Sequence, residues 1–110
     1  MSVKEEVHVA LSELAASDSP DDIAATMRAL HIKGRPGSGM LCPVAVYLSD
    51  RIACSFGEIA VNRTCVSLLT PHMIPGFKTV STLPLVELPP AVQRFIVRFD
   101  NHDYPDLELP

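Results

Sequence analysis

Apolar side chains recur every three or four residues near both ends of the chain, which is the spacing of a helix with one buried face. At the N-terminal end this pattern predicts a helix over residues 2–16. At the C-terminal end it predicts the clearest element of the chain, a helix that opens at Pro89 and Pro90. The two apolar stripes are Val3, Val7, Leu11 and Leu14, and then Val92, Phe95, Ile96 and Phe99.

A second helix has a clear start. Ser19 is expected at the N-cap and Pro20 at the first helical position, followed by two aspartates where the helix dipole favours negative charge. Gly34 predicts that this helix ends near residues 31–33, because glycine takes the left-handed conformation that closes a helix. The stripe expected to face the core is Ile23, Met27 and Leu30.

The next segment is a loop followed by a short third helix. Residues 33–39 hold three glycines and one proline, which predicts a loop with several special backbone angles. The third helix is expected to begin at Pro43. Its inward side chains are expected to be Val44, Tyr47 and Leu48.

The chain then changes to extended segments. Two strands are predicted near residues 56–61 and 64–69, joined by a two-residue turn at 62–63, since asparagine tolerates positive φ. Such a turn pairs Ile59 with Val66 on the core face. We expect Leu68 on the same face.

Prolines divide the second half of this region. Pro71 and Pro75 are expected to break the chain before an extended stretch over residues 77–88, which Pro84 marks as an edge strand. The sequence thus predicts an α+β fold with N-terminal helices, a central β-hairpin or three-stranded antiparallel sheet, and a C-terminal helix packing on it. A length of 110 residues indicates a single domain over residues 1–110, with residues 102–110 as a tail.

Composition excludes several classes of function. The net charge of −4 and pI near 5.4 disfavour nucleic acid and anionic lipid as partners, because both attract basic surfaces. No apolar run approaches the roughly 20 residues needed to cross a bilayer. The N-terminus lacks the apolar core of a signal peptide, so we expect a cytoplasmic protein.

Three segments resemble a set of short uncharacterised proteins of actinobacteria and their phages. They are residues 27–34, the Cys-Pro-Val-Ala-Val-Tyr-Leu segment at 42–48, and the ending that runs from Leu-Pro-Pro at 88–90 to Tyr-Pro-Asp-Leu at 104–107. The resemblance implies a bacterial or phage source and agrees with a cytoplasmic location. It implies no activity and gives no residue a role.

Cys42 is the most suggestive position for chemistry. It stands directly before the predicted third helix, where unpaired N–H groups and the helix dipole stabilise a thiolate. Lys33 and Arg35 lie upstream and add positive charge. A nucleophile also needs a base, and the sequence identifies no histidine for that part. The alternative is a buried or helix-capping cysteine, and faster alkylation of Cys42 than of Cys54 or Cys65 would favour the nucleophile.

The glycine-rich loop before Cys42 is a weak candidate for anion binding. Its candidate residues are Lys33, Arg35, Gly37 and Gly39, because glycines allow backbone N–H groups to converge on an anion. The loop lacks the Gly-Lys-Ser/Thr ending of a P-loop, so an ordinary connection between helices is the alternative.

No metal site or cofactor is expected. The three cysteines are ten or more residues apart, unlike the close pairs of structural zinc sites. The acidic residues around 100–108 lack the spacing and glycine of a calcium loop.

By elimination, the sequence predicts a small protein-binding or regulatory module without catalytic activity, with a protein partner or a second copy of the chain. Its contact surface is expected at the strand edge near residues 77–88 or on the outer face of the last helix. The first alternative is a cysteine-dependent or anion-binding activity centred on residues 33–43. The second is a winged-helix-like DNA binder, although the third helix offers a single arginine to a DNA groove.

Overall fold

The computed structural model describes residues 2–52, 58–74 and 76–109. Three helices come first, then three strands and a fourth helix, which confirms the expected α+β fold. The sheet is antiparallel in the order β1-β2-β3. The elements are α1 (Val3–Leu14), α2 (Pro20–Ala29), α3 (Pro43–Arg51), β1 (Glu58–Val61), β2 (Cys65–Ile74), β3 (Phe77–Glu87), α4 (Pro90–Asp100) and the 3-10 turn η1 (Pro105–Leu107).

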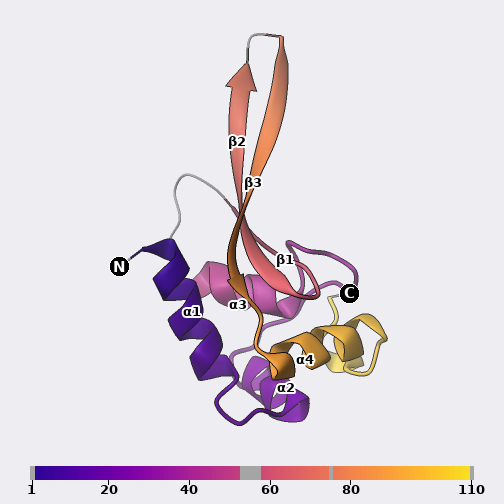
Figure 1. Ribbon diagram of the computed structural model, residues 1–110. Coiled ribbons are helices and arrows are strands. Elements are labelled where there is room, and N and C mark those ends of the chain that lie inside the picture. Colours follow the sequence, from indigo (N-terminus) through magenta and orange to yellow (C-terminus); the bar gives the residue numbers. More distant parts are fainter. Residues whose placement is uncertain (1, 53–57, 75, 110) are drawn as a thin grey trace.

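The helices form a body from which one hairpin projects. Figure 1 shows α1, α2, α3 and α4 gathered at one end, with β1 and the lower parts of β2 and β3 beside them. The upper parts of β2 and β3 continue away from the helices as a two-stranded arm. None of the helices in the described residues is long and apolar enough to span a bilayer.

The helix starts follow the sequence pattern closely. The Ser19 side chain accepts a hydrogen bond from the Asp22 N–H at 3.4 Å, and Pro20 is the first residue of α2, as expected. The end of α2 differs from the prediction. The helix stops at Ala29, and His31, with φ of +57°, takes the left-handed conformation expected of Gly34.

Gly34 is instead required by close packing. A Cβ there would lie 2.3 Å from the carbonyl oxygen of Leu41 and 2.6 Å from the nitrogen of Pro43. The Gly34 N–H donates to the Leu107 carbonyl at 2.9 Å, and its own carbonyl accepts from the Leu109 N–H at 2.8 Å. The missing side chain thus makes room for residues 41–43, while the backbone of Gly34 contacts the C-terminal segment.

This contact changes the description of the C-terminus. The segment expected to be a tail packs on the body: Leu107 is 2% exposed and the Tyr104 ring lies 5.4 Å from that of Phe95. Glu108 forms a parallel β-bridge with Gly34, so the segment has backbone hydrogen-bond partners that its sequence does not predict.

The first hairpin forms with a register different from the expected one. Val61 pairs with Val66 and Ile59 with Leu68, so the pairing is shifted by two residues. The reason is Asn62, whose side-chain oxygen accepts hydrogen bonds from the Thr64 N–H at 2.8 Å and the Cys65 N–H at 2.7 Å. These bonds stabilise a longer turn, and a shift of two keeps every side chain on its expected face.

β2 continues through Pro71, where a break was expected. The Thr64 carbonyl accepts from the Leu88 N–H, so alternation along β2 directs the backbone of Pro71 away from β3. A proline fits there because, in the part of the chain that the structure describes, β1 pairs with β2 only as far as Leu69. Pro84 lies in β3 beside a bulge, and β3 forms the expected edge strand.

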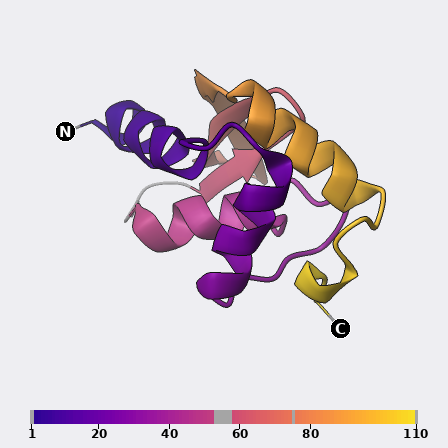
Figure 2. The same cartoon turned by 90° about the horizontal axis from the view of Figure 1, so that it is seen from below.

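The core is built on α4. Phe95 and Phe99 are fully buried with ring centroids 6.2 Å apart, as the apolar stripe predicts. Figure 2 shows α2 lying beside α4, and its Ile23 and Met27 are also fully buried. Leu30 was expected in the same stripe but is 52% exposed, because α2 ends before it.

Candidate functional site

Cys42 occupies the N-cap of α3. Its sulfur accepts a hydrogen bond from the Ala45 N–H at 3.4 Å, and the residue is 3% exposed. Burial raises the pKa of the Cys42 thiol, and the N–H groups at the helix start offset this only in part. This geometry supports the capping interpretation, because a nucleophile needs an accessible thiolate. Cys54 lies outside the described residues.

The glycine-rich loop does bind a carboxylate, but one from its own chain. The Gly37 N–H donates to a carboxylate oxygen of Asp100 at 2.9 Å, and Arg63 lies 3.8 Å from the other oxygen. The Asp100 side chain is 15% exposed. An external anion would have to displace this carboxylate.

The loop and the first hairpin turn enclose a cavity of about 290 Å³. The structure brings Cys42, Gly37 and Gly39 of the predicted residues to this cavity, together with Arg63 and Asp100. The exposed residues Lys33 and Arg35 are not part of its lining. Sequence reasoning missed Asp100 as the loop's partner because the two are more than sixty positions apart.

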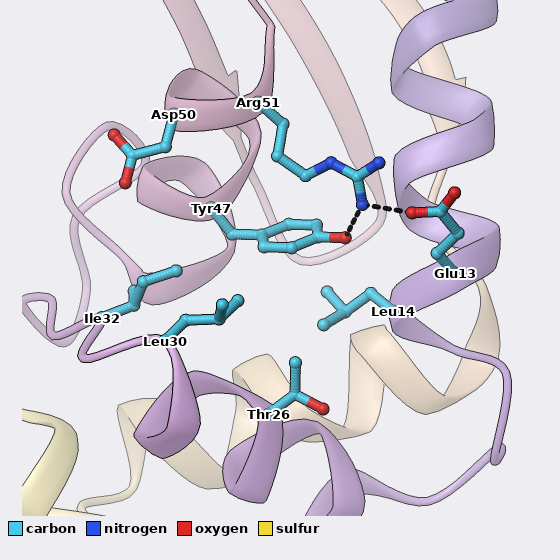
Figure 3. A pocket seen from close by; sticks show the side chains of 8 residues that line it. All are labelled: Glu13, Leu14, Thr26, Leu30, Ile32, Tyr47, Asp50 and Arg51. Atoms are coloured by element: carbon cyan, nitrogen blue, oxygen red, sulfur yellow. Dashed lines mark hydrogen bonds and ion pairs between the residues drawn. The ribbon is translucent and has the colours of Figure 1, made fainter.

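A larger cavity of about 510 Å³ lies between α1, α2 and α3 (Figure 3). Tyr47 runs along it, and its hydroxyl donates to the Ala10 carbonyl at 3.0 Å. Arg51 donates to the same hydroxyl at 2.6 Å and forms an ion pair with Glu13. Together these contacts fix the ring between two helices.

No local pattern in the sequence predicts this cavity. Its walls come from helices that are separated by loops, and the spacing of Tyr47 predicts only that it faces inward. The sequence feature that could have drawn attention to this site is the pair of adjacent charges, Asp50 and Arg51, at the end of an otherwise apolar helix.

The β2–β3 arm is a third candidate surface. Val80 is 57% exposed and Leu83 is 56% exposed, although both are apolar residues of a β-strand. Between Leu68 and Val86 the sequence holds one charged residue, Lys78. The arm therefore combines a projecting shape with exposed apolar side chains and a sequence that carries a single charged residue.

α3 does not present a basic face. Its apolar residues are buried except Val46, which is partly buried. Its exposed residues in the last turn are Ser49, Asp50 and Arg51, of which the arginine is paired with Glu13. Within the ranges that the structure describes, no three His, Cys, Asp or Glu side chains are grouped to hold a metal ion.

Comparison of the chain with models of protein families, with curated proteins and with solved structures found no match.

Proposed function

We propose that the protein is a small protein-binding or regulatory module of the cytoplasm, without catalytic activity, and that the β2–β3 arm contacts the partner. The observation that carries this proposal is the exposure of Val80 and Leu83 on an arm that leaves the body. Covering apolar surface contributes roughly 25 cal/mol per Å², so a partner gains by burying these side chains.

The construction of the arm supports the proposal. An isolated two-stranded hairpin is only marginally stable in water, and three strands or a packed face are needed for more. Within the residues that the structure describes, β2 pairs with β1 only as far as Leu69 and beyond it with β3 alone. A partner that adds a strand or an apolar groove supplies the missing support.

The outer edge of β3 offers a defined place for an added strand. The backbone N–H and C=O of Leu68 point toward β3, where Leu83 is its partner. Because these groups alternate in direction along a strand, those of Val80 and Thr82 point to the open edge of β3. Pro84 has no N–H and ends this open ladder toward the body. The edge thus accepts a short strand, and the single charge on the arm favours an apolar partner over a charged one.

The test replaces the exposed apolar side chains by a residue that keeps strand propensity. The variant is Val80→Thr combined with Leu83→Thr, because threonine is β-branched like valine and favours strands. The matched control is Val9→Thr combined with Val97→Thr, two helix positions that are each 39% exposed. Light scattering over a range of concentrations measures self-association, and quantitative capture from a bacterial lysate measures other partners.

We expect a complex of defined stoichiometry with the parent and the control, and at least about a tenfold loss of affinity with the arm variant, or about 1.4 kcal/mol. A second copy of the chain as partner would appear as a dimer that the arm variant dissociates. A complex that is unchanged by the arm variant, or no complex with the parent, contradicts the proposal.

A further inference from the structure

The cavity between α1, α2 and α3 has the size of a small-molecule site. Its volume of about 510 Å³ lies within the roughly 300 to 1,000 Å³ typical of such sites. It is separate from the β2–β3 arm, so a ligand there is independent of the proposed protein contact.

One side of the cavity is apolar. Figure 3 shows the Tyr47 ring with Leu14 and Leu30 across from it, and Ile32 next to Leu30. Leu30 lines the cavity and is 52% exposed, since it follows the last residue of α2. A hydrocarbon ligand would cover this leucine and contact the ring of Tyr47.

The charges of the lining select the polar group of the ligand. Glu13 and Arg51 neutralise one another, and the same Arg51 nitrogen also donates to the Tyr47 hydroxyl. Asp50 lies on the other side of Tyr47 from Glu13 in Figure 3, and no residue of the described part forms a hydrogen bond or ion pair with its carboxylate. The lining therefore carries one uncompensated negative charge.

We propose that this cavity binds a small apolar primary amine. The ammonium group pairs with Asp50, and the hydrocarbon body lies between Tyr47 and Leu30. A carboxylate ligand would have to compete with Glu13 for Arg51 and would be repelled by Asp50. A neutral ligand of the same shape would gain the apolar contact alone.

Three probes of one shape test the assignment: 2-phenylethylamine, 2-phenylethanol and 3-phenylpropionate. Binding is followed by chemical-shift changes in the ¹⁵N-labelled protein, which also locate each probe. Because an ion pair that is open to water is weak, we expect the amine to bind about three- to fivefold more tightly than the alcohol. Dissociation constants in the millimolar range suit ligands this small.

Two variants separate the contributions. Asp50→Asn is expected to remove the preference for the amine and leave the alcohol's affinity unchanged, whereas Asp103→Asn, on an exposed carboxylate outside the cavity lining, is expected to change neither. Leu30→Ala is expected to weaken both probes. Tighter binding of 3-phenylpropionate would make Arg51 the anchor and overturn the proposal. Equal binding of all three probes, or no shifts at the lining residues, would also overturn it.

Discussion

The helical body and the β2–β3 arm differ in how far they bury their apolar side chains. In the body, α4 buries Phe95 and Phe99 completely against residues of the other helices. In the arm, Val80 and Leu83 are each more than half exposed. Since burial of apolar surface is the main stabilising contribution to folding, the body accounts for the stability of the chain. The arm contributes an exposed apolar surface, which a partner covers under the proposed function.

The largest expected effect is in the body. Phe95→Ala or Phe99→Ala removes a fully buried ring and leaves a cavity, so we expect a loss of about 3–5 kcal/mol in the free energy of unfolding. Urea denaturation followed by circular dichroism measures it. Val97→Ala, on the exposed side of the same helix, should change the value by about 0.5 kcal/mol or less. A Phe95→Ala variant as stable as the parent would show that α4 is not the centre of the core.

The next largest effect is expected at two glycines, of which one is required by close packing and the other by its backbone angle. Gly34→Ala places a methyl group against the Leu41 carbonyl and Pro43, which costs about 2–3 kcal/mol. Gly37→Ala meets no neighbour within 4 Å but must hold a φ of +76°, which costs about 1 kcal/mol. The same urea titrations measure both. A larger loss at Gly37 than at Gly34 would contradict the close packing of Gly34 against Leu41 and Pro43.

Local spacing predicted the parts of the fold that depend on local rules. The apolar stripe of α4 and the Ser19 cap of α2 follow from side chains a few positions apart, and both are present. The predicted register of the first hairpin was wrong because the Asn62 side chain accepts hydrogen bonds from the backbone N–H groups of Thr64 and Cys65 in the turn. A prediction from turn propensity does not include such side-chain hydrogen bonds, which compete with those between backbone groups.

Features that join distant segments were not predictable. The contact of Gly34 with Leu107, and that of Gly37 with Asp100, each span more than sixty positions. The first contact joins the expected tail to the body, and the second places a carboxylate of the chain itself at the expected anion site. The cavity around Tyr47 has the same origin, since three separate helices form its walls. Candidate residues such as Cys42 can be named from sequence, but their burial depends on what packs over them.

A labelling experiment compares the body with the base of the arm. Cys42 is buried with a raised thiol pKa, whereas Cys65, at the start of β2, is partly exposed. We expect iodoacetamide at neutral pH to modify Cys42 at least about tenfold more slowly than Cys65. Mass spectrometry of the peptides measures both rates, and the difference should vanish in denaturant. Faster modification of Cys42 in the folded protein would restore the nucleophile hypothesis for residues 33–43.

The smallest expected effect concerns the arm itself. Val80→Thr combined with Leu83→Thr keeps β-branched or strand-favouring side chains at positions that are already exposed, so the free energy of unfolding should change by about 0.5 kcal/mol or less. Together with a loss of partner binding, this result would show that these two side chains are dispensable for the fold and required for contact. A loss above about 1 kcal/mol would mean that these side chains support the body after all. The separation between a stabilising body and an exposed binding arm would then fail.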